Sequence, residues 1–438
     1  MRRFFRILRR GARAWVLSFL MVVGIGGWGV YHWWSEDWRA FLPGQTSHAH
    51  YQIEIACNVC HTPYEGVKQE SCLACHALQL RLVKDTHPVD KFARPTGTAA
   101  PKVPDATRCI SCHKEHAPRV TRAVAVTQPS DFCVHCHTDI KKERPSHQSF
   151  APTTCASSGC HNYHDNTVLR EDVLAPRRAE PAILPRAVVA LTRGRQFAVN
   201  LQASPGLLPE QDGSAHARAG VNCPKCHEMR NTIEGSPEWN RRPGPSDCVK
   251  CHEPEVQGFL GSRHGMRLLQ KLSPMTPAMA RLPMNPAAHH RDVTCASCHA
   301  AHLFDTRPAP VQACLSCHAD DHTRAYLTSP HYKLWRAEAS GQAAPGTGVS
   351  CATCHLPRVV HERDGRQRVI TQHNQNDTLR PTSRMLRTVC LNCHGPAFAI
   401  DALADRELAR RNFTGKPSRH VESLDMIDTK LRTTGKTP

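Results

Sequence analysis

Pairs of cysteines followed directly by a histidine recur along this chain of 438 residues. In RCISCHKEHAP, residues 108–118, two thiols (Cys109 and Cys112) and two imidazoles (His113 and His116) lie within eight positions. Thiols and imidazoles are the side chains that bind zinc, iron–sulfur clusters and haem. The recurrence therefore predicts one kind of cofactor site that the chain uses many times.

The C-x-x-C-H pattern occurs ten times, and a looser C-x4-C-H occurs once. The tight motifs have their cysteines at Cys57 and Cys60, Cys72 and Cys75, Cys109 and Cys112, Cys133 and Cys136, Cys223 and Cys226, Cys248 and Cys251, Cys295 and Cys298, Cys314 and Cys317, Cys351 and Cys354, and Cys390 and Cys393. The looser motif is formed by Cys155, Cys160 and His161. Together the eleven motifs use all 22 cysteines of the chain.

This spacing is typical of covalent c-type haem attachment. Two thiols separated by two residues can each form a thioether with a vinyl group of one porphyrin, and the next histidine can ligate the iron. A single C-x-x-C also fits half of a zinc site or a thioredoxin-like redox pair, but neither requires a histidine after every pair. We therefore expect eleven covalently attached haem c groups, with the proximal ligands His61, His76, His113, His137, His161, His227, His252, His299, His318, His355 and His394.

Many further histidines are available for the second axial position of each iron. The chain has 29 histidines, and removing the eleven proximal ones leaves 18. His116, His164 and His302 each follow a proximal histidine by three residues, so we expect them to serve a neighbouring haem rather than their own. The candidate distal ligands are His48, His50, His87, His116, His135, His147, His164, His216, His264, His289, His290, His302, His322, His331, His361, His373 and His420.

The density of these motifs bears on the fold class. From Cys57 to His394 the chain has 338 residues, which is about 31 for each of eleven sites. Porphyrins at this density would supply most of the buried apolar surface, and the 33 prolines and 25 glycines favour a loop-rich chain. The predicted fold is mostly α and irregular, poor in strands and packed around haem, with a single N-terminal transmembrane helix.

The N-terminus predicts that helix. Six arginines lie in the basic segment 1–13, and an uncharged run of 22 residues follows at 14–35, long enough to span a bilayer. The arginines should stay in the cytoplasm, with Trp28, Trp33 and Trp34 at the far interface. A cleaved signal peptide would have a shorter apolar core and small residues at its cleavage site. We therefore expect an uncleaved anchor in a bacterial inner membrane, with the haem region in the periplasm.

The motifs divide the rest of the chain into blocks. Residues 36–56 are predicted to be a tether, 57–166 a domain with five haem sites, and 167–214 a linker rich in proline, alanine and arginine. A domain with six sites is expected at 215–425, followed by a polar tail at 426–438.

The formal net charge of +18 does not predict a nucleic-acid partner. Each haem brings two propionates, which would offset most of this charge, and the chain has no nucleic-acid-binding motif. The expected partners are the membrane, redox proteins or quinol, and a small oxyanion if the protein is an enzyme. Self-association into oligomers is compatible with the sequence.

Two resemblances refine these expectations. The motifs CISCHKEHAP, FCVHCHTDIKKERPSHQSF and GCHNYHD of the first block resemble those of small multihaem cytochromes of the c3/c7 type. The second block resembles the hydroxylamine oxidoreductase and octahaem tetrathionate reductase superfamily, in the segments CLSCHADDHTRAYLTSPHYKLW, GVSCATCHLPRV and RMLRTVCLNCHGP.

The second resemblance implies a catalytic haem with an open distal face. Its Asp and His map onto Asp320 and His331, beside His322 and Ser329, and the order of motifs assigns the open haem to His299. The chain has no tyrosine after Tyr332 and no C-x-x-C-K site, so neither a tyrosine cross-link to the porphyrin nor a lysine-ligated haem is expected.

The favoured function is electron transfer. We expect a membrane-anchored, periplasmic cytochrome with eleven closely packed, mostly bis-histidine haems, carrying electrons from a membrane donor to a periplasmic or outer-membrane acceptor. Bis-histidine ligation suits low potentials, because methionine ligands raise them. The alternative is a terminal reductase of nitrite, hydroxylamine or tetrathionate at one five-coordinate haem.

Overall fold

The structure is a computed structural model. It describes residues 2–35, 38–83, 108–117, 125–144, 147–148, 150–155, 163–165, 171–184, 214–221, 223–227, 229–231, 237–300, 302, 306, 309–363, 365–379 and 384–434. Three predicted ligands, His87, Cys160 and His161, lie outside these residues.

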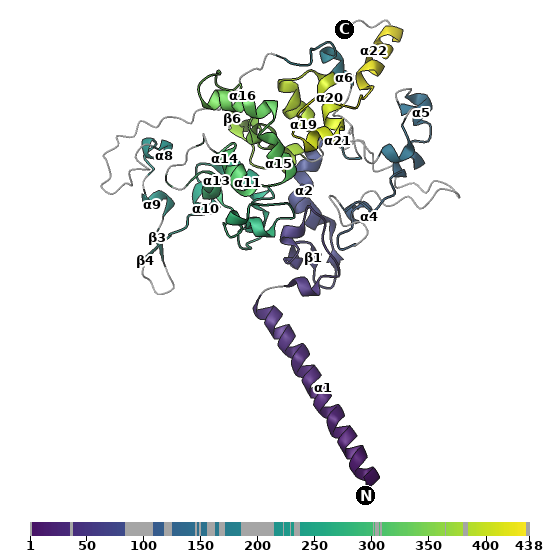
Figure 1. Cartoon of the computed structure of the whole chain (residues 1–438), viewed down its shortest axis with the longest axis vertical. Helices are drawn as coiled ribbons and strands as arrows, with labels where there is room; N and C mark the ends of the chain where they lie inside the picture. The colour runs from purple at the N-terminus through teal and green to yellow at the C-terminus, as the bar shows by residue number, and fades with distance from the viewer. Residues whose placement is uncertain are drawn as a thin grey trace. The chain divides into compact units, whose positions relative to one another are not determined.

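The N-terminal segment forms one long helix, α1 (Arg2–Trp34), drawn in purple in Figure 1. Its apolar stretch Ala14–Trp34 has 21 residues and a mean hydropathy of 1.7, and none of it is buried within the protein. At 1.5 Å per residue the stretch is about 31 Å long, which matches the hydrocarbon core of a bilayer. The expected single helix of membrane-spanning length is therefore confirmed.

The chain divides into two compact units, residues 1–68 with 110–127 and residues 69–109 with 128–438. In the first unit the short helices that follow α1 are η1 (Trp38–Phe41), η2 (Tyr51–Ile53) and η3 (Cys57–Val59). The first motif then enters a small hairpin, in which β1 (His61–Thr62) pairs with β2 (Gly66–Val67). Most of α4 (Cys109–Cys112) also belongs to this unit.

The second unit consists mainly of short helices. The α-helices are α2 (Gln69–Val83), α5 (Ile140–Glu143), α6 (Glu171–Leu174), α8 (Ala215–Arg218), α9 (Cys223–Cys226), α10 (Pro245–Cys248), α11 (Glu253–Leu260), α12 (Met266–Leu269), α13 (Cys295–Cys298), α14 (Gln312–Cys317), α15 (Asp321–Tyr326), α16 (Pro330–Ala339), α17 (Cys351–His355), α18 (Asn376–Leu379), α19 (Arg384–Thr388), α20 (Pro396–Ala404), α21 (Arg406–Arg410) and α22 (Ser423–Thr434). The 3-10 helices are η4 (Phe132–His135), η6 (Pro152–Thr154), η7 (Ala175–Arg177), η8 (Pro277–Met279), η9 (Pro286–Ala288) and η10 (Cys390–Asn392).

Strands form only two-stranded antiparallel hairpins in the part of the chain that the structure describes. In the second unit β3 (Met229–Asn231) pairs with β4 (Pro237–Trp239), and β5 (Arg358–Arg363) pairs with β6 (Arg366–Thr371). With about half of the residues in helices and few in strands, the predicted mostly α, strand-poor fold is confirmed.

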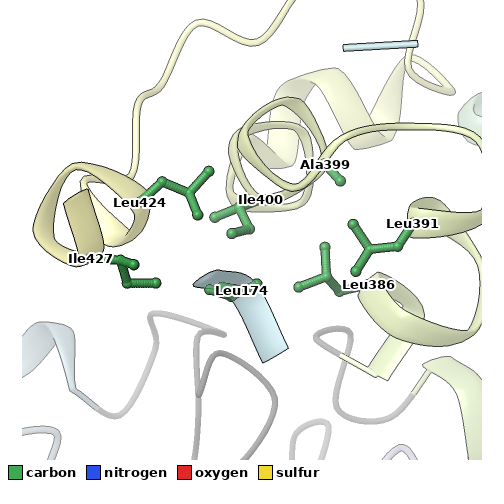
Figure 2. Packing of buried hydrophobic residues seen from close by; sticks show 7 residues of the cluster. All are labelled: Leu174, Leu386, Leu391, Ala399, Ile400, Leu424 and Ile427. Carbon is green, nitrogen blue, oxygen red and sulfur yellow. The ribbon is translucent and has the colours of Figure 1, made fainter. Parts of the chain in front are cut away.

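One apolar cluster stands out in the second unit, where side chains of α6, α19, η10, α20 and α22 meet (Figure 2). Leu386 of α19 is 1% exposed, and Leu174 of α6 is fully buried. The cluster comprises Leu174, Leu386, Leu391, Ala399, Ile400, Leu424 and Ile427.

This cluster uses residues that the sequence assigned to a linker and a tail. Leu174 lies within the predicted linker 167–214, yet it packs against the C-terminal helices. Ile427 lies within the predicted polar tail, but α22 is amphipathic and buries this side chain. A single leucine in a segment rich in proline and arginine gives no periodic signal, so only packing reveals its role.

Candidate haem-binding sites

In the part of the chain that the structure describes, the cysteine–histidine motifs adopt short helical turns. Residues three apart lie on one face of a helical turn, so both sulfurs of a motif can reach the same porphyrin. In several motifs the backbone N–H of the proximal histidine donates to the carbonyl of the first cysteine, at 2.8 Å for His227 and 2.9 Å for His318 and His394. The repeated sequence thus produces a repeated local conformation.

Hydrogen bonds from capping side chains define the N-terminal residue of some of these helical turns. Ser350 accepts a hydrogen bond from the backbone N–H of Thr353 at 3.1 Å, and Thr353 accepts one from the backbone N–H of Ser350 at 3.0 Å. Ser297 accepts one from the backbone N–H of Thr294 at 3.1 Å. Such reciprocal caps satisfy N–H groups that a short helix would otherwise leave without acceptors.

Seven proximal histidines in the described part of the chain face a second histidine. The distances between ring centroids are 6.4 Å for His61 with His116, 6.0 Å for His227 with His302, 5.9 Å for His252 with His216, 6.2 Å for His299 with His373, 6.2 Å for His318 with His264, 6.1 Å for His355 with His322, and 6.3 Å for His394 with His331. Each second histidine was among the predicted distal candidates.

These distances fit iron between the two rings. Two imidazoles that bind one metal ion from opposite sides, through bonds of about 2.0 Å, have ring centroids about 6 Å apart. That separation is too long for stacked rings in contact and too short for an intervening side chain. The residues present therefore fit a haem iron with two axial histidines.

Backbone carbonyls orient many of these imidazoles. Nδ1–H donates to a carbonyl in His116 (Gly44, 2.8 Å), His227 (Asn240, 2.6 Å), His322 (Ala409, 2.7 Å), His373 (Thr371, 2.9 Å) and His394 (Ala182, 3.0 Å). A proton fixed on Nδ1 leaves Nε2 as the ligating atom and holds the ring plane in place. Sequence reasoning missed these contacts, because a backbone carbonyl has no residue signature.

Two amide side chains, those of Gln375 and Asn412, also contact ring nitrogens of the proposed distal histidines. The amide nitrogen of Gln375 lies 3.1 Å from Nδ1 of His264, while Oε1 of the same amide is buried without a partner. Rotating this amide by half a turn would let Nδ1–H donate to Oε1, which satisfies both groups. Asn412 donates a hydrogen bond to Nε2 of His322 at 3.1 Å, so this nitrogen is unprotonated. Its lone pair could bind iron in place of this hydrogen bond.

The partly buried imidazoles are held in the neutral form that binds metal. Burial lowers the pKa of His264 and of His355 to about 4. Burial also lowers the pKa of His299, His318 and His373. A neutral imidazole presents its lone pair to iron without losing a proton first.

Two of the three histidines that follow a proximal histidine by three residues share an unusual backbone conformation. His116 has φ 57° and His302 has φ 69°, both in the left-handed region. Each faces the proximal histidine of another motif, His61 and His227 respectively. The left-handed residue ends the turn of its own motif and sends the ring towards the neighbouring site.

Other predicted ligands have different contacts in the structure. His50 donates to Glu115 at 2.7 Å, and Glu115 also accepts from the backbone N–H of Ser47. Burial opposes the charge on Glu115, but the hydrogen bonds from His50 and Ser47 outweigh it and hold the pKa of the carboxyl at about 2. His76 contacts Oε1 of Gln79 through Nδ1 at 2.9 Å, and His420 lies between Asp401 and Asp425.

The remaining candidates are placed as follows. His48, His147 and His164 lie beside aromatic rings, and His361 lies on β5 opposite Arg368. His113 pairs with Val126 in an isolated bridge, and the backbone N–H of His137 donates to Cys133. His135 ends η4, while His289 and His290 follow η9.

The residues proposed for an open catalytic haem have contacts with other motifs. Asp320 accepts hydrogen bonds from the backbone and hydroxyl of Thr323 as the cap of α15, and its carboxylate lies 3.9 Å from Nδ1 of His318. His331 faces His394, while His299 faces His373. Helix capping and axial geometry thus account for Asp320 and His331 without an open site at His299.

Other uses of the cysteines have no support in the structure. The described cysteines are thiols rather than disulfides. Among the described residues, no three or more His, Cys, Asp or Glu side chains converge as a bare metal ion would require. Opposed imidazoles supply two ligands only, which leaves four positions for a porphyrin.

Comparison with known proteins agrees with this chemistry. A family model described as cytochrome c3 matches residues 49–138 and 215–319. Searches of curated proteins and of solved structures returned no significant match. The matched residues include motifs from both predicted haem blocks. Together with the motifs, this match supports a multihaem c-type cytochrome with covalently bound haem and an electron-transfer role.

Proposed function

We propose that the protein is a periplasmic electron carrier with eleven haems, held at the inner membrane by α1. The opposed histidine pairs carry this proposal. They support seven distal ligands, His116, His302, His216, His373, His264, His322 and His331, one for each of seven proposed haems.

Six-coordinate iron suits electron transfer rather than substrate chemistry. An iron with two histidines has no vacant position, and its ligands stay the same when it changes oxidation state. Bis-histidine ligation also keeps the potential lower than ligation by methionine does. Such haems can accept electrons from quinol or a membrane protein and pass them to a periplasmic or outer-membrane acceptor.

Helix α1 supports attachment to the membrane. Apolar side chains along it are open to the surroundings, for example Leu17 at 67%, Val22 at 69% and Ile25 at 59% exposure. An exposed apolar helix of this length is stable when lipid covers it. The attached haem region would then lie on the periplasmic side, where c-type cytochromes are typically found.

A terminal reductase needs an iron with a free distal face, and the proposed candidate was the haem of His299. His373 faces His299 at 6.2 Å, so this site favours the carrier. No observation at the other described sites favours reduction of an oxyanion.

Electron paramagnetic resonance of the oxidised protein, with and without nitrite, tests the proposal. We expect only low-spin signals from the seven assigned haems, and no change when nitrite is added. Mass spectrometry and a pyridine haemochrome assay on the same sample should give eleven haems. A high-spin haem that binds nitrite and reduces it with electrons from reduced viologen would overturn the proposal that the protein is only an electron carrier.

A further inference from the structure

Sulfur atoms from different motifs touch at two places in the second unit. The thiol of Cys248 hydrogen-bonds that of Cys295, and the thiol of Cys314 hydrogen-bonds that of Cys351. Each contact joins the first cysteines of two motifs that follow one another in the sequence. Haem attachment replaces the S–H protons, but the backbone still holds the sulfurs side by side.

A thioether sulfur is separated from the porphyrin ring by one carbon atom. Two such sulfurs in contact therefore place the edges of two porphyrins next to each other. A backbone hydrogen bond from Ala352 to Pro310, of 3.2 Å, fixes the start of α17 beside the start of α14. This holds the Cys314 and Cys351 motifs together independently of their side chains.

The imidazoles of the same motifs are also close neighbours. His299 interacts electrostatically with His252 and His216, which are the two ligands assigned to the preceding haem. His355 interacts in the same way with His318 and His264. A short peptide contributes to the second pairing, because His318 and His322 lie four residues apart and serve the two different haems.

Longer-range contacts connect these pairs to each other and to the two remaining motifs. Cys298 is close enough to Cys314 for their charges to interact, which links the first pair to the second. Cys226 interacts with Cys248 in the same way, and Cys390 with Cys354. The site of His227 also adjoins the His299 motif, which supplies its distal ligand His302.

We propose that the six haems of residues 223–394 form one electron path that follows the order of the sequence, from His227 through His252, His299, His318 and His355 to His394. Within it the haems of His252 and His299 form one closely coupled pair, and those of His318 and His355 form another. The inference rests on the proposed axial ligands and adds the order of the haems. One-electron exchange occurs between neighbours, one being oxidised as the other is reduced.

Paired titrations of the full-length holoprotein test the order. Replacing a distal histidine by methionine raises the potential of that haem and gives it a distinct sulfur–iron absorption band, so it can be followed alone. His216→Met labels the haem of His252, and His373→Met labels the haem of His299. In the double variant, reduction of one labelled haem places an electron beside the other, so the second midpoint potential should fall below its value in the single variant.

Distant haems provide the control. His373→Met combined with His331→Met labels the haems of His299 and His394, and the double variant should titrate as the sum of its single variants. A second cycle with His264→Met and His322→Met tests the other pair, and it remains informative if the first pair fails to fold. Additive potentials in a pair of proposed neighbours that retains all its haems would overturn the order.

The proposed order and the proposed ligands fail in different ways. If His373→Met or His216→Met keeps its full haem content by mass but acquires no methionine-ligated absorption band, the axial assignment is wrong. If the band appears and the pair cycles are additive, only the order is wrong.

Discussion

The imidazoles of His299 and His373 face each other with their ring centroids 6.2 Å apart. His373 reaches this position because it follows the β5–β6 hairpin, whose base is closed by a hydrogen bond of 2.9 Å from the backbone N–H of Gln372 to the carbonyl of Pro357. The carbonyl of Thr371, the last residue of β6, then accepts from Nδ1 of His373. The β5–β6 hairpin thus positions His373, the proposed distal ligand of the haem at His299.

Removing this ligand should open one iron. In His373→Ala we expect one haem to become high-spin and to bind nitrite, measured by electron paramagnetic resonance, while the haem content by mass stays unchanged. Val360→Ala on β5 of the same hairpin, where the side chain is 62% exposed, is the matched control and should keep the wild-type spectrum. A low-spin spectrum in His373→Ala would show that another group ligates this iron.

Each motif should hold one haem through its cysteines. Replacing Cys351 and Cys354 together by alanine should lower the mass of the purified protein by one haem, because no thioether can then form at that site. The side chains of Ser350 and Thr353 cap the same turn but take no part in attachment, so Thr353→Ser should retain the full haem content. A haem content unchanged in the double cysteine variant would contradict covalent attachment there.

The apolar cluster should make a large contribution to stability. Leu386→Ala and Leu174→Ala each remove a side chain that is at most 1% exposed, and each should lower the free energy of unfolding by about 2–5 kcal/mol. Urea unfolding followed by circular dichroism measures this. Leu269, 44% exposed on α12, is the control, and its alanine variant should change stability by about 0.5 kcal/mol or less. If Leu174→Ala left the free energy of unfolding unchanged, the segment around Leu174 would act only as a linker, as the sequence predicts.

The ion pairs of His420 should make stability depend on pH. Hydrogen bonds to Asp425 and then to Asp401 raise the pKa of His420 to about 8, from about 6.5 in an unfolded chain. The contribution is therefore complete below pH 6.5 and is lost as the pH rises through 8. Because His420 is exposed, the effect should be no more than about 1 kcal/mol.

Unfolding of the wild type and of Asp425→Asn between pH 6 and 9 checks this dependence. The two proteins should differ at pH 6 and converge at pH 9. A difference that grows with pH would contradict the assigned pairing of His420.

A charge in the middle of α1 should weaken attachment to the membrane. Val23→Arg places a cation near the centre of the apolar stretch, at a cost of about 2.5–3.5 kcal/mol, whereas Tyr31→Arg lies near its end and should cost less. Alkaline extraction of membranes, with the haem region detected by its absorption, should release more of the Val23→Arg protein. Equal retention of both variants would argue against a spanning α1.

The sequence alone sufficed to predict the attachment sites and the proximal ligands. The two sulfurs and the imidazole of a motif are close in the chain, so their spacing is itself the geometry that a porphyrin needs. The same holds for α1, whose length and apolar composition suffice to predict a helix that can span a membrane.

Only the tertiary structure decided which second histidine faces which motif. His264 precedes its partner His318, whereas His373 comes long after His299 and His216 lies before His252. No spacing rule produces these pairs, because groups from distant segments orient imidazoles such as His116, His264 and His322. The sites of covalent haem attachment can therefore be predicted from the sequence. The second axial ligand of each iron depends on how separate segments of the chain pack together.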